Sequence, residues 1–195
     1  MTNAEIFNKY GCVCVDGFLD PLTLSTVSHY FENRIKRGEW TPKAEKDPTS
    51  KFAYYGDPLI EVVLKEHLPI VEEACGKELL PTYSYSRIYQ PGEELTPHVD
   101  RSSCEISVTV SVAYRGEPNS IWMHYENNPP MEYTLEPGSA VVYKGCEARH
   151  WRYPLKDDQL VVQFMLHYVD KNGPFADRVF DTRDSLGMSS ENRRS

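Results

Sequence analysis

The residues best suited to do chemistry in this sequence are His98 and Asp100, which lie two positions apart. An imidazole and a carboxylate with this spacing project from one face of an extended segment, so both can reach one metal ion. They match two corners of a facial triad, which binds iron(II) and leaves coordination positions open. We expect the pair to lie at the start of a strand over residues 106–114. The site then needs a third ligand from a distant strand.

His150 is the best candidate for that third ligand. It follows a predicted turn, strand and second turn over residues 137–145, where the chain can return to the same end of a sheet. His167, late in the last predicted strand, is the alternative. His29 and His67 fall on predicted helices, and we assign them structural roles.

The first 80 residues or so are expected to be a largely helical support. A short strand is expected within residues 12–19. Asp20-Pro21 and Asp57-Pro58 each place an N-capping aspartate before a proline at the first helical position. The helices expected after them are residues 20–38 and 57–66, with a restart at Pro69 toward Gly76, and residues 39–49 are expected to form a loop.

Strand-forming runs dominate from residue 81 onward. These runs are rich in β-branched and aromatic residues and are separated by clusters of Gly, Pro and Asn. The expected strands are residues 83–89, 106–114, 121–125, 140–143 and 160–169. Four side chains share one face of the first: Tyr83, Tyr85, Arg87 and Tyr89. The sequence therefore predicts an α+β fold, a double-sheet roll with helices packed outside one sheet.

Length and composition indicate one domain over residues 1–195, with a catalytic core at about 81–170 and a flexible tail at about 184–195. The 21 basic and 29 acidic residues give a formal charge of −8, which disfavours nucleic acid as a partner. Five scattered cysteines without a Cys-x-x-Cys pair indicate reduced thiols. We find neither a leader nor an apolar run of membrane-spanning length, and expect a soluble cytoplasmic protein with no membrane partner.

Residues 81–169 resemble the 2-oxoglutarate and Fe(II)-dependent dioxygenases, within them the prolyl-hydroxylase-like branch. The matching pattern is Tyr89-x-x-Gly92-x-x-Leu95-x-x-His98-x-Asp100, then Pro137-Gly138-Ser139-Ala140 and His150-Trp151-Arg152. The resemblance implies a double-stranded β-helix, a cupin-like jelly roll, with the N-terminal helices packed on its major sheet.

By the same resemblance, His98, Asp100 and His150 bind Fe(II), and 2-oxoglutarate chelates that ion. The hydroxyl of Tyr89 would help to hold the far carboxylate of 2-oxoglutarate. The implied reaction uses O2 to hydroxylate an aliphatic C–H bond and releases succinate and CO2, with ascorbate as a possible reductant.

One departure from the family concerns the base that pairs with the far carboxylate. The family places an Arg or Lys nine to eleven residues after the distal histidine, where this sequence has Gln159-Leu160-Val161. A buried dianion without a cation is costly, so another base must replace it. Arg152 is our first choice because its planar fork grips a carboxylate through two hydrogen bonds. Lys156 is the second choice and Arg87 the third.

The substrate class stays open between a prolyl or other peptidyl side chain, an amino acid and a small metabolite. Expected substrate contacts are Trp40, Tyr54 or Tyr55, Arg101, Trp122 and His124. Two other functions are compatible with the same residues. One is a non-catalytic cupin-like binding protein, motivated by the missing base, and the other is a zinc hydrolase that uses the same triad. Nucleic-acid demethylation is disfavoured by the acidic charge.

Overall fold

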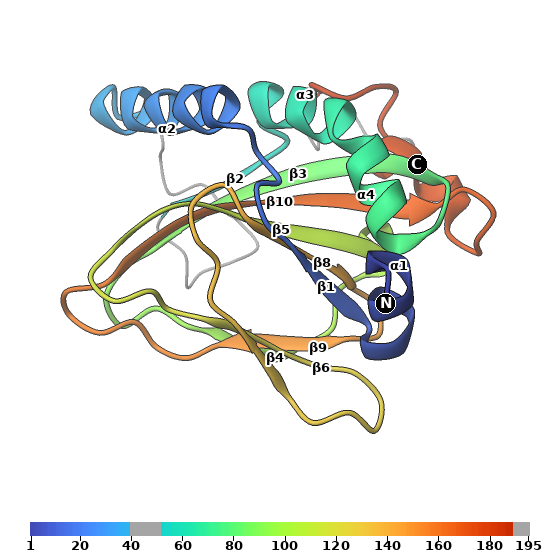
Figure 1. Ribbon diagram of the computed structural model, residues 1–195. Coiled ribbons are helices and arrows are strands. Elements are labelled where there is room, and N and C mark those ends of the chain that lie inside the picture. Colours follow the sequence, from blue (N-terminus) through green and yellow to red (C-terminus); the bar gives the residue numbers. More distant parts are fainter. Residues whose placement is uncertain (40–51, 189–195) are drawn as a thin grey trace.

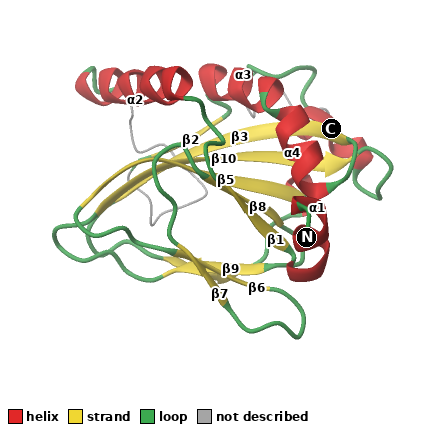
Figure 2. Cartoon of the chain, in the orientation of Figure 1, coloured by secondary structure: helices red, strands yellow, loops and turns green. Residues whose placement is uncertain are grey.

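The computed structural model describes residues 1–39 and 52–188 and has two antiparallel β-sheets that face each other (Figure 1). Helices cover the outer side of the larger sheet, as the cartoon coloured by secondary structure shows (Figure 2). This arrangement confirms the α+β class predicted from the sequence.

The larger sheet has six strands. Their order is β1 (Cys12–Val15), β8 (Ala140–Lys144), β5 (Ile106–Arg115), β10 (Leu160–Asp170), β3 (Leu79–Tyr89) and β2 (Ala53–Tyr55). The two longest strands, β3 and β10, lie side by side. Their register sets Arg87 opposite Gln163 and Tyr83 opposite His167. Residues distant in the chain therefore share one face of the sheet.

The smaller sheet has four strands. Their order is β4 (Leu95–His98), β9 (Arg149–Arg152), β6 (Ile121–His124) and β7 (Met131–Tyr133). Within it, His98 pairs with His150, and His150 pairs with Met123 on its other side. The smaller sheet thus brings the two histidines of the predicted triad together.

The helices are α1 (Asn3–Tyr10), α2 (Pro21–Lys36), α3 (Pro58–Glu66) and α4 (Leu68–Cys75), with 3-10 segments η1 (Ser102–Cys104) and η2 (Ala176–Thr182). Asp20 and Asp57 cap α2 and α3 as predicted, each accepting two backbone N–H groups. Phe31 of α2 packs edge-on against Phe164 of β10, and both side chains are buried. None of the described helices is long and apolar enough to cross a membrane.

Several short elements were not predicted from the sequence: α1, β2, β4 and β7. Each of these strands has three or four residues, too few for a period to emerge, so pairing with a neighbour decides its conformation. The expectation that His98 and Asp100 start the 106–114 strand is wrong. His98 ends β4 in the smaller sheet, and Asp100 lies in the segment that crosses to β5 in the larger one.

The C-terminal segment is fixed to the helical side of the larger sheet. The guanidinium of Arg183 is fully buried and donates to Glu61 Oε1 at 2.6 Å, to the Thr82 carbonyl at 2.9 Å and to the Met188 carbonyl at 2.6 Å. A tail over residues 184–195 was expected to be flexible. Within it, the Gly187 N–H donates to the Glu61 carboxylate and the Met188 carbonyl accepts from Arg183. Residues 189–195 lie outside the described residues.

Candidate active site

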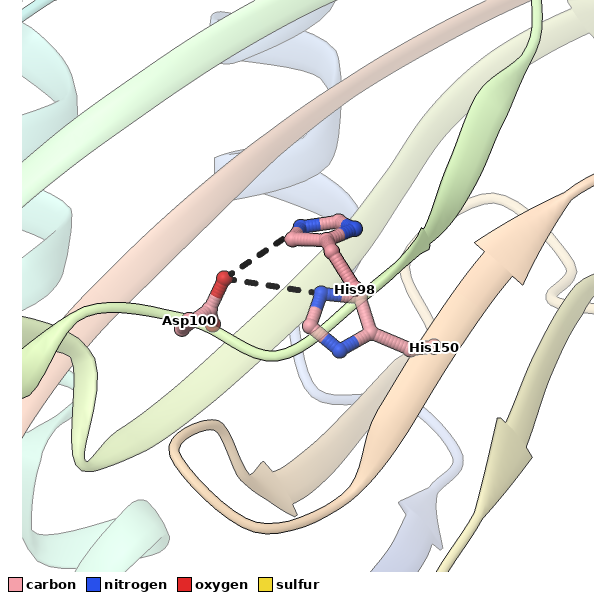
Figure 3. Close-up of side chains that lie close together, drawn as sticks. All are labelled: His98, Asp100 and His150. Carbon is pink, nitrogen blue, oxygen red and sulfur yellow. Dashed lines mark ion pairs between the residues drawn. The ribbon is translucent and has the colours of Figure 1, made fainter.

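Three side chains of the predicted triad converge between the two sheets (Figure 3). Asp100 Oδ1 lies 3.6 Å from His98 Nε2 and 3.5 Å from His150 Nε2. The two imidazole rings are 4.3 Å apart between their centroids. Each residue offers one donor atom to a common point, with all three donor atoms within 4.8 Å of one another. These residues therefore form one candidate metal site.

Backbone carbonyls fix the protonation pattern of both imidazoles. His98 Nδ1 lies 2.8 Å from the Thr96 carbonyl, and His150 Nδ1 lies 3.0 Å from the Ala148 carbonyl. A carbonyl can only accept, so Nδ1 carries the hydrogen in each ring. In the neutral ring, Nε2 is then left with a lone pair directed toward Asp100, which is the arrangement that a metal ion needs.

A backbone crossing and a glycine place the third donor. The Asp100 N–H donates to the Gly145 carbonyl at 2.8 Å, which ties the segment after β4 to the turn after β8. A side chain at Gly145 would collide, because a Cβ there would lie 2.0 Å from the Cys104 carbonyl and 2.7 Å from Asp100 Oδ2. Only glycine leaves the room that the Asp100 carboxylate occupies.

The charge state of Asp100 suits a metal ligand. Burial tends to raise the pKa of its carboxyl, but hydrogen bonds that the His150 and His98 rings donate when both ring nitrogens carry a hydrogen outweigh burial and hold that pKa well below its usual range. The hydrogen bond to Asp100 in turn raises the pKa of His98, against the opposing effect of burial. Asp100 is therefore ionised at neutral pH and attracts a cation.

A cavity of about 230 Å³ lies beside the three candidate ligands. Tyr83, Tyr85, Arg87 and Tyr89, which alternate along β3, all line it, as their shared face predicted. The facing strand β10 adds Gln163, Met165 and His167 to the lining. A second, more open hollow shares Arg87, Leu95 and His98 with this cavity and carries Glu93 and Glu94.

The end of the cavity away from Asp100 is built around two buried arginines. Tyr89 is 1% exposed, and the guanidinium carbons of Arg87 and Arg152 lie 4.0 Å and 5.3 Å from its ring centroid. Such cation–π contacts contribute about 0.5–2 kcal/mol each. Arg87 lines the cavity, whereas Arg152 does not. Both arginines therefore pack on the Tyr89 ring, but Arg87 borders the cavity and Arg152 lies outside its lining.

Arg152 forms hydrogen bonds with one residue outside the cavity and one that lines it. It donates to the Asn119 carbonyl and, at 2.8 Å, to Oε1 of the cavity-lining Gln163, while its Nε has no hydrogen-bond partner among the described residues. Burial lowers the pKa of Arg152, as does the charge of nearby Arg87, while Tyr89 acts in the opposite direction. Lys156 is exposed and pairs with Glu117 at 3.0 Å. Neither base lines the cavity, although Arg152 reaches it through Gln163.

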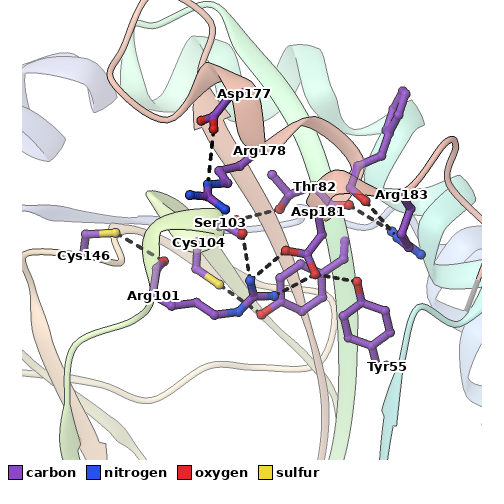
Figure 4. A network of polar contacts seen from close by, with 12 residues as sticks. Tyr55, Thr82, Arg101, Ser103, Cys104, Cys146, Asp177, Arg178, Asp181 and Arg183 are labelled. Carbon is purple, nitrogen blue, oxygen red and sulfur yellow. Dashed lines mark hydrogen bonds and ion pairs between the residues drawn. The ribbon is translucent and has the colours of Figure 1, made fainter. Parts of the chain in front are cut away.

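Beyond the triad, a polar network connects the next residue to the C-terminal segment (Figure 4). Both terminal nitrogens of Arg101 donate to Asp181, at 2.7 Å and 2.9 Å. The Tyr55 hydroxyl also donates to Asp181, at 2.6 Å. Asp181 sits between Phe180 and Thr182, and all three have positive φ, a backbone strain that the network sustains. Arg101, expected to contact substrate, is engaged here instead.

The other expected substrate contacts are placed differently. Trp122 and His124 alternate with the buried Met123, which neighbours His150, so they lie on the outer face of the smaller sheet. Trp122 stacks there on Trp151, with 6.1 Å between ring centroids. Both side chains therefore point away from the cavity, contrary to the substrate contacts expected of them. Tyr55 stacks on the cavity-lining Tyr83, Tyr54 lies under the guanidinium of Arg34, and Trp40 falls outside the described residues.

The residues that surround His167, the alternative ligand, were not predicted from the sequence. His167 lies behind Asp100, with Nδ1 2.9 Å from the Ser107 hydroxyl. Burial lowers the pKa of His167 to about 4, against the charge of Asp100, so the ring is neutral at pH 7. Asp100, Cys104 and His167 form a second group of possible metal ligands within 4.8 Å. His29 and His67 take no part in either group.

The donor set fits iron(II). Two imidazole nitrogens and one carboxylate oxygen on the wall of a cavity are the ligands of a facial triad, which leaves positions for other molecules. The buried arginine pair at the far end also fits an acid that has one end at the metal, since a cationic partner is needed for a buried carboxylate.

No protein-family model matches this sequence, and no curated protein matches it by sequence. Solved structures do match. A Pseudomonas putida prolyl-4-hydroxylase is 14% identical, with TM-score 0.66 over 84% of this chain and 95% of that one. A 2OG-Fe(II) oxygenase family oxidoreductase from Burkholderia pseudomallei is 15% identical, with TM-score 0.63 over 88% of this chain and 90% of that one.

The epimerase SnoN, solved in complex with Fe3+, alpha ketoglutarate and nogalamycin RO, is 13% identical, with TM-score 0.69 over 98% of this chain and 92% of that one. The likeness extends over most of each chain although few residues are identical. The structure thus agrees with the resemblance seen in the sequence: this chain has the fold of solved 2-oxoglutarate and Fe(II) oxygenases.

Proposed function

We propose that this protein is an Fe(II)- and 2-oxoglutarate-dependent dioxygenase that hydroxylates an aliphatic C–H bond. The observation that carries the proposal is the convergence of His98 Nε2, His150 Nε2 and Asp100 Oδ1 at the wall of a cavity. Backbone carbonyls leave both Nε2 atoms free to ligate. The fold shared with solved oxygenases of this kind supports it.

A double-stranded β-helix, or cupin-like jelly roll, is part of the same proposal. The two facing antiparallel sheets, with the helices outside the larger one, support it. The ligands belong to one end of this roll, where β4 and β9 pair and the chain crosses from β4 to β5.

His98, Asp100 and His150 would hold the iron. When bound, Fe(II) and 2-oxoglutarate supply the oxidation of the C–H bond by O2, with release of succinate and CO2 and with ascorbate as an optional reductant. The chain itself binds these groups, orients the substrate and limits the access of water. Its carbonyls at Thr96 and Ala148 keep the two ligating rings in the required tautomer.

We place the far carboxylate of 2-oxoglutarate at Arg87 and Tyr89 rather than at Arg152, our first choice from the sequence. Arg87 is 4% exposed and lines the cavity, and the Tyr89 ring packs against its guanidinium. Gln163, which faces Arg87 from β10, is also on this wall. The cation missing from residues 159–161 is thus replaced by one from the adjacent strand.

In this proposal Arg152 does not bind the carboxylate itself but supports the residues that do. Its hydrogen bond to Gln163 and its contact with the Tyr89 ring hold two cavity-lining side chains in place. Lys156 has no part in the proposed site because its exposed side chain pairs with Glu117.

The size of the cavity limits how a substrate can bind. Sites that enclose a drug-sized ligand measure about 300–1,000 Å³. The cavity beside the ligands, about 230 Å³, has room for 2-oxoglutarate and for one small group. We therefore expect the substrate to be a prolyl or other peptidyl side chain, an amino acid or a small metabolite that enters from the open hollow shared at His98.

We also propose a cytoplasmic location, since all five cysteines are free.

Anaerobic addition of Fe(II) and 2-oxoglutarate to the metal-free protein tests the proposal. A weak visible charge-transfer band should appear, and admission of O2 with a peptide and metabolite panel should release succinate above the uncoupled level. A protein with neither the band nor calorimetric binding of 2-oxoglutarate would be a binding protein instead. Metal analysis that finds zinc, without succinate release, would favour a hydrolase.

A further inference from the structure

The two oxygens of the Asp100 carboxylate have different surroundings. Oδ1 faces the Nε2 atoms of His98 and His150, at 3.6 Å and 3.5 Å. Oδ2 points the other way and accepts a hydrogen bond from the Ser107 hydroxyl at 2.8 Å. One oxygen is therefore presented to the metal site, and the other is held by the protein.

The direction of each hydrogen bond around Ser107 follows from a count of hydrogens. Its Oγ lies 2.8 Å from Asp100 Oδ2, 3.1 Å from the Cys104 carbonyl and 2.9 Å from His167 Nδ1. An ionised carboxylate and a carbonyl can only accept, and the hydroxyl has one hydrogen to donate. His167 Nδ1 must therefore be the donor to Ser107, and Ser107 donates to the closer and charged Asp100.

Ser107 and His167 are buried, while Asp100 and one side of His167 line the cavity. His167 is 5% exposed, and its ring lies 4.5 Å from that of Tyr83. Gly145 closes the space behind Asp100, since a Cβ there would lie 2.7 Å from both Asp100 Oδ2 and Ser107 Oγ. Ser107 itself has no exposed surface. A water molecule thus has little room to take the place of the hydroxyl.

We propose that Ser107 and His167 are positioning residues of the metal site, which hold Asp100 so that Oδ1 alone is presented to the ion. His167 acts through Ser107 and is not a ligand, although it lies close enough to Asp100 to be taken for one. The inference rests on the proposed function only in assuming that His98, Asp100 and His150 bind a divalent metal.

Calorimetric titration of the metal-free, full-length protein with Co(II) alone measures this role without turnover. Loss of an outer partner of a metal ligand costs about 10- to 100-fold in metal affinity. We expect that loss for Ser107→Ala. The matched control is Ser84→Ala, which removes a buried hydroxyl without a hydrogen-bond partner in the described part of the chain, and should bind Co(II) like the wild type. Equal binding by Ser107→Ala and the wild type would overturn the proposal.

Two substitutions at His167 separate a positioning residue from a ligand. In His167→Asn, the side-chain amide occupies the place of Nδ1 and restores a donor to Ser107, so Co(II) affinity should stay within a few-fold of wild type. His167→Leu removes the donor and should weaken binding about 10-fold. The visible spectrum of bound Co(II) should keep its band positions in His167→Asn. A loss in His167→Asn as large as that in His150→Ala would make His167 a ligand and refute the proposal.

The outcomes also separate this inference from the proposed function. If the wild type binds Co(II) but never releases succinate, the proposed function is wrong, and the Co(II) affinities of the variants still decide the positioning role. A wild type that turns over normally, together with undiminished Co(II) binding by Ser107→Ala, would remove the positioning role alone. A wild type that binds no Co(II) would overturn both.

Discussion

The two ends of the cavity are built in different ways. At the metal end, His98 and Asp100 are two residues apart in the chain, and a single strand pair adds His150. At the arginine end, Arg87, Gln163 and Arg152 come from β3, β10 and β9, and meet only because strands of both sheets converge there. The first end leaves a short pattern in the sequence, whereas the second leaves Tyr89 and three candidate bases with no order of spacing that chooses among them.

The difference teaches where each kind of function tolerates change. A metal ion needs three donor atoms at fixed separations, so the ligand types and their spacing are constrained. A carboxylate needs a cation with hydrogen-bond donors within reach, and neighbouring strands can supply it equally well. A base on β3, such as Arg87, can meet the same requirement as a base nine to eleven residues after the distal histidine. The predictions below test whether the two ends really have separate tasks.

The largest effect should follow from His150→Ala. Its Nε2 is one of two nitrogen donors facing Asp100, so its loss should lower Co(II) affinity by more than the ~100-fold upper range for an outer partner. Calorimetric titration measures this. His29→Ala on the exposed face of α2 is the control. Retained metal affinity in His150→Ala would move the distal ligand to His167.

Arg87→Gln should affect only the opposite end. Removal of one partner of a buried charge pair costs about 2–5 kcal/mol, which corresponds to a loss of at least ~30-fold in 2-oxoglutarate affinity. Co(II) affinity should not fall, because the positive charge of Arg87, which also acts on His98, does not favour a second cation nearby. Binding of 2-oxoglutarate to the Co(II)-loaded protein is the measurement, and Lys156→Gln is the control. Weakened metal binding in Arg87→Gln would mean that the two ends are not separate.

Arg152→Gln should have a smaller effect on the same measurement. Its guanidinium acts through Gln163 and Tyr89, so we expect about a 10-fold loss of 2-oxoglutarate affinity, near that of other outer partners. The comparison with Arg87→Gln decides the anchor. If Arg152→Gln loses more affinity than Arg87→Gln, then Arg152 is the direct partner of the carboxylate.

The smallest effect on either end should come from Asp181→Asn, which alters the network next to the triad. Burial tends to raise the pKa of Asp181, but hydrogen bonds from Arg101 and Tyr55 lower it well below its usual range. A lowered pKa means that the carboxylate stabilises the fold above the unfolded pKa of about 3.9, and that this stability is lost as pH falls below it.

We therefore expect Asp181→Asn to lower the free energy of unfolding by about 1–2 kcal/mol at pH 7, since Arg101 is half exposed and partly screened. Denaturant unfolding at pH 7 and pH 3 should show the gap between wild type and variant narrowing at the lower pH. If the difference in unfolding free energy between wild type and Asp181→Asn were the same at both pH values, Asp181 would not be ionised in the folded protein. Co(II) and 2-oxoglutarate affinities serve as the check that both ends remain intact.

The features that depend on local spacing could be predicted from the sequence alone. Asp20 and Asp57 cap helices because a carboxylate before a proline satisfies the first backbone N–H groups wherever it occurs. The long apolar strands β5 and β10 and the cavity-facing alternation along β3 were likewise predictable from their periods. The proposed ligands His98 and Asp100 were identified from their two-residue spacing.

Only the tertiary structure decided which sheet each residue joins and what lies opposite it. Asp100 reaches the imidazoles because its segment crosses from β4 to β5 and is held by a hydrogen bond to the Gly145 carbonyl. Trp122 faces outward because its neighbour Met123 points into the interior. Arg87 faces Gln163 through the register of two strands some 75 residues apart in the chain. Register arises from the packing of whole strands rather than from local spacing, so the sequence supplied Tyr89 and three candidate bases but not which base lines the cavity.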